Sequence, residues 1–168
     1  MINENWAKWV YSSILNHFEE SEYFIKWETY LEDPHTYDEQ GITPMYIDGC
    51  SFDSKDVKDY IEIRIEGPDI VEVSNNYFKI TLDLNILTSV TKDSNIWKTH
   101  ELVGKVQKTF STISVYRYGS GTEDNNSLVG CLNRQNKMET IPWGQPDPNI
   151  KQIQQTIESQ YKMQIKGD

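Results

Sequence analysis

The sequence predicts an α+β fold in which a mostly antiparallel sheet with long strands is packed by two helices. Three observations carry this prediction: a period-2 pattern of residues over 78–87 within the segment 77–91, helical spacing of apolar residues near the N-terminus, and the same spacing over about 96–110. At roughly 3.3 Å per residue, a strand over 77–91 would reach about 45 to 50 Å. We therefore expect one end of it to project beyond the body.

The first element is a helix over about residues 4–21. Asn3 is a suitable N-cap, and apolar residues recur three and four apart at Trp6, Trp9, Val10, Ile14 and Phe18. For residues 26–31 the pattern favours a short strand, with a prolonged helix as the alternative. Residues 33–48 contain Pro34, Gly41 and Pro44 among polar neighbours, which predicts a long loop.

The next segments predict a hairpin. Isoleucines alternate with charged residues over 60–66, and Gly67-Pro68 is expected to end that strand. A brief strand over 70–73 follows. The turn Ser74-Asn75-Asn76 joins it to the strand 77–91, because Asn tolerates positive φ. Such a connection makes the sheet at least partly antiparallel.

The remainder of the chain predicts the second helix and further strands. Lys92 to Asn95 supply capping side chains before the helix 96–110, and strands are expected at 114–118, 128–132 and 137–143. For residues 150–166, apolar residues fit either a helical stripe or the alternation of a strand. We favour a long strand.

Length and charge narrow the functional classes. The 168 residues are expected to form one domain, 1–168, without a membrane span or secretory leader. The formal charge is −10, which argues against nucleic acid as the main partner. Residues 1–75 carry 17 acids and 5 bases, whereas residues 76–168 carry 9 acids and 11 bases. This asymmetry could orient subunits in an assembly or could be a solvated acidic face.

Catalytic and ligand-binding motifs are weak throughout. The segment 33–39 gathers acids around His35, but one histidine without a second His or Cys at metal spacing predicts no metal site. His17 and His100 fall within the two helices, where structural roles are expected. Cys50 and Cys131 lack a nucleophile signature, and Gly119 to Thr122 lacks the lysine of a P-loop. The sequence therefore predicts no enzyme and no cofactor.

Several segments, taken in order, resemble one group of bacteriophage virion proteins. They are the N-terminal helix, the acidic loop, the helix after Asp93, the C-terminal strand, and the strings Tyr60 to Pro68, Tyr77 to Asp93, Val115 to Gly119, Ser127 to Leu132 and Gly144 to Pro148. In this layout the chain is similar to phage tail terminator or tail completion (neck) proteins.

The resemblance implies a structural protein rather than a catalyst. It implies an α+β subunit that forms a homo-oligomeric ring of six on the end of a completed tail tube, stops tube growth and meets the head-side connector. DNA would pass through the lumen without specific binding, helped by acidic side chains. The protein would be made in the bacterial host cytoplasm and reside in the virion tail or neck.

Ring formation needs interfaces between subunits, and aromatic or projecting residues are the best anchors for them. We expect these residues at the interface: Tyr37, Val90, Lys92, Tyr116 and Tyr118. Two alternatives stay open. One is a small cone-like α+β enzyme or ligand-binding protein with an apolar pocket, and the other is an accessory interaction protein unconnected with virions.

Overall fold

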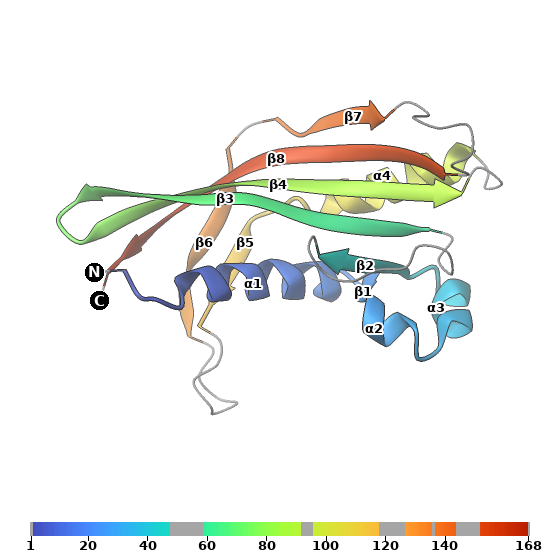
Figure 1. Ribbon diagram of the computed structural model, residues 1–168, viewed down its shortest axis with the longest axis horizontal. Helices are drawn as coiled ribbons and strands as arrows, with labels where there is room; N and C mark the ends of the chain where they lie inside the picture. The colour runs from blue at the N-terminus through green and yellow to red at the C-terminus, as the bar shows by residue number, and fades with distance from the viewer. Residues whose placement is uncertain are drawn as a thin grey trace.

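The computed structural model describes residues 2–47, 59–91, 96–117, 127–135, 137–143 and 152–167. Figure 1 shows helices packed on a long, twisted sheet. In chain order the elements are α1 (Trp6–Glu20), β1 (Phe24–Lys26), α2 (Trp27–Tyr30), α3 (Pro34–Gln40), β2 (Thr43–Ile47), β3 (Tyr60–Ser74), β4 (Tyr77–Thr91), α4 (Ile96–Thr109), β5 (Ile113–Tyr116), β6 (Leu128–Arg134), β7 (Glu139–Trp143) and β8 (Gln152–Lys166).

Three long antiparallel strands form the centre of the sheet. β4 pairs with β3 on one side and, from Tyr77↔Lys166 to Thr91↔Gln152, with β8 on the other. The sheet order is β1-β2-β3-β4-β8-β6-β5, with β7 also paired to β8. Only the β1–β2 and β2–β3 pairs are parallel. The fold is thus α+β with a mostly antiparallel sheet, as the sequence predicts.

The hydrophobic core lies between the sheet, α1 and α4 (Figure 1). The predicted stripe of α1 faces this core, and the inward residues of the central strands alternate with outward ones. The fully buried large side chains include Ile14, Phe18, Ile61, Ile63, Ile80, Leu84, Ile86, Ile157 and Tyr161. Each such residue removes apolar surface from water, at about 25 cal/mol per Å².

Four sequence predictions are confirmed with small shifts of boundary. They are the first helix, the long strand 77–91, the second helix, and the strand interpretation of 150–166, which β8 bears out over 152–166. The predicted strands near 114–118, 128–132 and 137–143 correspond to β5, β6 and β7. The helical alternative for residues 150–166 is wrong, because β8 pairs with β4 along its whole length.

Two predictions between α1 and β3 are wrong. Residues 26–31 form the end of β1 and then α2, and the expected loop 33–48 contains α3 and β2. The Asp33 carboxylate accepts hydrogen bonds from Thr36 N at 3.4 Å and Thr36 Oγ1 at 2.6 Å. Pro34 follows in the first turn, and Gly41 ends α3 at φ +71°. These are ordinary helix start and stop signals, so the proline and glycine frame a short helix instead of a loop.

The predicted strand end at Gly67-Pro68 is also wrong. β3 continues through it as one strand to Ser74, with a register shift between Glu66 and Asp69. Gly67 adopts φ +94°, which suits glycine, and the extra residues form a bulge against the unbroken β4. A bulge therefore replaces the predicted break.

The β3–β4 hairpin ends in a projecting arm, which we define as residues 66–81. Figure 1 shows its tip reaching beyond the helices at one end of the molecule. The predicted projection is present, but at the turn between Ser74 and Tyr77. The opposite end of β4 is covered, since Val90 is only 1% exposed.

Candidate functional site

The described structure places three of the five predicted interface residues. Tyr37 is half-buried on α3, with its ring centroid 6.2 Å from that of Tyr30. Val90 is buried at the end of β4. Tyr116 is half-buried on β5, and its backbone N–H donates to Ser13 Oγ at 3.0 Å. Lys92 and Tyr118 lie outside the described residues.

Among the three described positions, Tyr37 and Val90 lie beside the same cleft. Val90 lines a cleft of about 270 Å³ together with Asp38 and Gly41, the neighbours of Tyr37 at the end of α3. The other walls of this cleft are β2 and α4. Tyr116 lies on the far strand of the sheet order, against α1. The three predicted residues that the structure describes therefore do not form one continuous surface.

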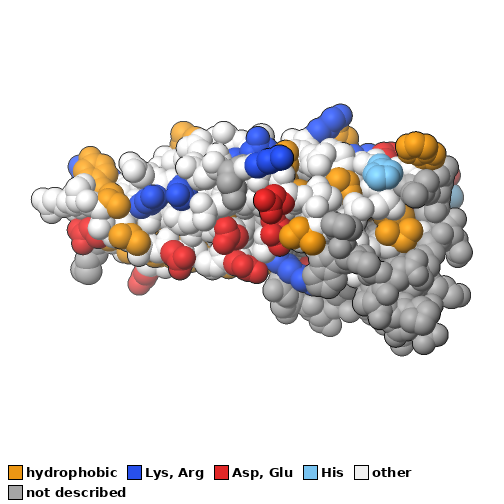
Figure 2. Space-filling model, turned by 90° about the horizontal axis from the view of Figure 1, so that it is seen from above, with side chains coloured by type: hydrophobic (Ala, Val, Ile, Leu, Met, Phe, Trp, Pro, Cys, Tyr) orange, Lys and Arg blue, Asp and Glu red, His pale blue; other side chains and the backbone are white. Residues whose placement is uncertain are grey.

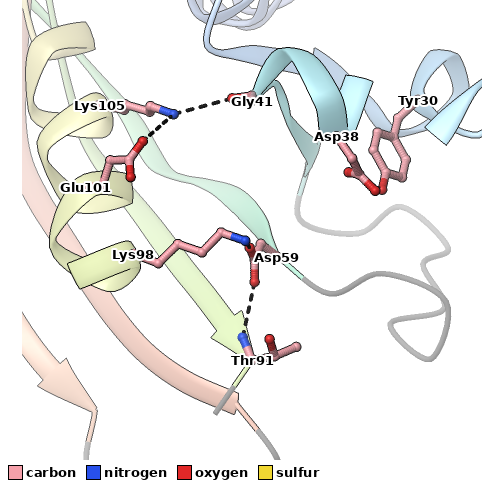
Figure 3. Close-up of polar contacts among 8 residues, drawn as sticks. All are labelled: Tyr30, Asp38, Gly41, Asp59, Thr91, Lys98, Glu101 and Lys105. Atoms are coloured by element: carbon pink, nitrogen blue, oxygen red, sulfur yellow. Dashed lines mark hydrogen bonds and ion pairs between the residues drawn. The ribbon is translucent and has the colours of Figure 1, made fainter. Parts of the chain in front are cut away.

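Salt bridges and a hydrogen bond line the cleft between α3 and α4, which we call the α3–α4 cleft (Figure 3). Lys105 Nζ lies 3.2 Å from Glu101 Oε1 and donates to the Gly41 carbonyl at 3.3 Å. Lys98 Nζ lies 2.7 Å from Asp59 Oδ2. These contacts tie α4 to the end of α3 and to the start of β3.

A buried tyrosine anchors α3 from the other side. Tyr30 is 5% exposed, and its hydroxyl donates to Asp38 Oδ1 at 2.9 Å (Figure 3). Burial, followed by this hydrogen bond, raises the pKa of Tyr30 to about 12. The tyrosine thus stays neutral at physiological pH. The polar groups of the cleft bind one another, which favours a structural tie over proton transfer.

A second polar cluster lies on the outward face of β2 and β3. The Glu62 carboxylate is 7% exposed and accepts hydrogen bonds from Tyr46 Oη at 2.9 Å and from Arg64 Nε at 2.9 Å. Burial and the hydrogen bond to Glu62 raise the pKa of Tyr46. Arg64 Nη2 completes a bidentate pair at 3.0 Å. The buried charge is therefore neutralised within the chain.

The histidines on the described helices contact protein groups. His17 Nε2 lies 2.8 Å from the Thr109 carbonyl, which links α1 to α4, and His35 lies 3.0 Å from Glu39 on α3. Within the described part of the chain, no group of three or more His, Cys, Asp or Glu is arranged to hold a metal ion. No helix among the described residues is long and apolar enough to cross a membrane.

The arm carries the exposed surface that sequence reasoning missed. Exposed fractions are 58% for Val71, 50% for Val73 and 45% for Tyr77. Figure 2 shows hydrophobic side chains exposed at this end of the molecule as well as at the opposite end. Beyond Ile63, the outer edge of β3 has no partner strand among the described residues, because β2 pairs only with residues 61–63. The signal in the sequence is the apolar run around Ile70, Val71 and Val73. Adjacent apolar residues in a strand point to opposite faces, so the face in contact with water also carries apolar side chains.

Comparisons with known proteins assign no family to this chain. No protein-family model matches the sequence, and no curated protein matches it. The solved structures that are similar include one at 10% identity and a TM-score of 0.49, over 94% of this chain and 97% of that chain. The name of that protein states no activity or partner, and a likeness this distant carries no argument about function.

Proposed function

We propose that this chain is a structural subunit of a phage virion that assembles into a ring, in the manner of tail terminator or tail completion proteins. The ring, a homohexamer, caps the tail tube and meets the connector or neck proteins on its head side. DNA passes through its lumen without specific binding. The proposal adopts the sequence resemblance and is supported by one structural observation, the exposed apolar arm.

The physical argument starts from the cost of exposing this arm. Val71, Val73 and Tyr77 leave apolar area in water at the end of a long hairpin, although the chain buries comparable residues elsewhere. Along the β3 edge beside them, no strand among the described residues pairs with the backbone N–H and C=O groups. Apolar side chains next to a free strand edge are the features that protein partners cover. Assembly would remove both from solvent.

The polar sites support the same proposal of a structural role. The charged groups of the α3–α4 cleft and the Glu62 cluster are held in ion pairs and hydrogen bonds inside the subunit. An enzyme typically directs several polar groups toward one substrate position. Here those groups stabilise the junctions between elements, so the arm is the better candidate for function.

The test combines mass measurement with electron microscopy of tail tubes. Native mass spectra would be recorded over a range of concentrations, with and without purified tubes, and tube ends would be imaged. We expect rings that cap the tubes. Val71→Lys together with Val73→Lys should abolish capping, because two charges would have to be buried in the contact. Leu128→Lys is the matched control, since Leu128 is also 58% exposed but lies on β6.

A wild-type chain that leaves every tube end open, and stays monomeric beside them, would refute the proposed function. A capping activity that survives the double arm variant would remove the arm from the interface. Circular dichroism of each variant would show that its fold is intact.

A further inference from the structure

The outer face of the arm combines apolar and basic side chains. Cross-strand partners in a sheet share a face, and the register places Tyr77 opposite Lys166, Lys79 opposite Val71, and Thr81 opposite Lys162. Ile80, between Lys79 and Thr81, points to the core and is fully buried. We call Val71, Tyr77, Lys79, Lys162 and Lys166 the arm patch.

The lysines of the arm patch are available to a partner. Within the described part of the chain, none of the three lies within ion-pair distance of an acid. Lys79 and Lys162 line one open hollow of about 530 Å³. Figure 2 shows basic side chains near the arm end, with hydrophobic and acidic ones close by. Asp69 lies opposite Thr81 within the patch, and the next row toward the body places Glu66 and Asp83 on the same face. The patch therefore suits an acidic surface that also offers an apolar contact.

The chain itself carries such a surface at its other end. Residues 27–41, which contain α2 and α3, include five acids and no Lys or Arg: Glu28, Glu32, Asp33, Asp38 and Glu39. Leu31 is 49% exposed in the middle of them. Figure 1 places α2 and α3 at the end of the long axis opposite the arm tip. The arm patch of one subunit and residues 27–41 of a second copy are thus complementary in charge and in apolar content.

We propose that the arm patch binds residues 27–41 of a neighbouring copy of this chain. The contact joins two different surfaces, so it is heterologous and repeats head to tail until a ring closes. This inference rests on the proposed ring and names the contact that builds it. Lysine ammonium groups then face carboxylates across the interface, with Val71 and Tyr77 against Leu31. Added salt weakens such a contact by screening.

Charge reversal tests the pairing directly. The arm variant carries Lys79→Glu and Lys162→Glu, and the segment variant carries Glu28→Lys and Glu32→Lys. These substitutions leave intact Asp33, which caps α3, and Asp38, which accepts the hydrogen bond from Tyr30. All four substituted residues are at least partly exposed. Lys8→Glu on exposed α1 surface is the control. Sedimentation velocity would be measured at about 50 and about 500 mM salt, which changes screening severalfold.

We expect each double variant alone to associate about tenfold more weakly or worse, because like charges would meet across the contact. An equimolar mixture should recover association, since a reversed arm then meets a reversed segment and a native arm meets a native segment. An even-numbered ring can close with the two variants alternating. The Lys8 control should associate like the wild-type chain.

Three outcomes would overturn the contact. In the first, wild-type rings form but neither double variant weakens them. In the second, both variants dissociate and their mixture does not recover. In the third, the wild-type chain stays monomeric at low salt and millimolar concentration. Capping of tail tubes, assayed separately with the same samples, decides the proposed function. An arm variant that self-associates but no longer caps would show that the patch faces the tube.

Discussion

The ammonium of Lys98 and the backbone N–H of Thr91 contact the same carboxylate, that of Asp59, at 2.7 Å and 3.2 Å. Through this one side chain, the first turn of α4 is joined to the end of β4 and to the residue before β3 (Figure 3). The junction lies beside the cleft that separates α3 from α4. The contribution of this junction to stability can be measured by replacing Asp59 and Lys98 separately.

Asp59→Ala should destabilise the fold more than Lys98→Ala does. The Asp59 side chain is 16% exposed and holds two partners, whereas the Lys98 side chain is 54% exposed. Loss of the hydrogen bond to a charged group predicts a fall of about 1.5 to 3 kcal/mol in the free energy of unfolding. Loss of the exposed ion pair alone predicts about 0 to 1 kcal/mol. Urea titration followed by circular dichroism measures both, and equal effects would contradict the shared role of Asp59.

Ser13→Ala should loosen the attachment of α1 to β5. Ser13 is 2% exposed, and its Oγ accepts the hydrogen bond from Tyr116 N. Removing that acceptor predicts a loss of about 1 to 3 kcal/mol in unfolding free energy. Ser12→Ala, one residue earlier and only partly buried, is the control and should change stability little. Hydrogen exchange at the Tyr116 amide would rise in the first variant and not in the second.

Gly67→Ala should be more harmful than Gly130→Ala. At Gly67, φ is +94°, and a new Cβ would lie 3.2 Å from Asp69 N and 3.3 Å from Thr81 O, both backbone atoms. Backbone strain of this kind costs about 1 to 3 kcal/mol. At Gly130 the close atom, at 2.9 Å, is the terminal methyl of Met163, which can move. Thermal unfolding should show a Tm drop of about 2 to 4 °C per kcal/mol for a chain of this size.

Tyr30 makes stability sensitive to alkaline pH. Its pKa is raised from 10.0 to about 12 by burial and by the hydrogen bond to Asp38, so folding favours the neutral phenol. The resulting stabilisation is complete below pH 10 and is lost as pH rises from 10 toward 12. Tyr30→Phe should therefore be less stable at pH 8 but lose less stability between pH 10 and 12. Denaturant midpoints at these pH values provide the test, and parallel pH profiles would contradict it.

The local sequence pattern predicts those helices and strands in which buried residues recur at a regular spacing. The stripe of α1 and the alternation of β4 each report one buried face, and that face meets the core as expected. Residues 27–47 lack such a repeat, so the sequence predicts Pro34 and Gly41 to be loop residues. In the structure they instead mark the start and the end of helix α3. Residues 152–166 form a strand because they pair with β4, which is distant in the sequence. This pairing excludes the helical alternative.

Surface sites were harder to predict than elements. The sequence predicts Val90 at an interface because it lies near the end of a long strand, yet it is only 1% exposed and lines a cleft with Leu102 of α4. The arm patch depends on the register between β3 and β4 and on that between β4 and β8, and the latter joins distant residues such as Thr81 and Lys162. No short motif contains that information. Charge composition did indicate an acidic first half, and residues 27–41 lie within it.

The place of β8 in the sheet has a consequence for biosynthesis. This strand pairs along all fifteen residues of β4 and also joins β6 and β7, yet it follows every other strand in the chain. While the ribosome is still translating residues 152–167, β4 therefore lacks one of its two partner strands. We expect native structure to form only after these residues leave the exit tunnel, with chaperones protecting the incomplete sheet until then.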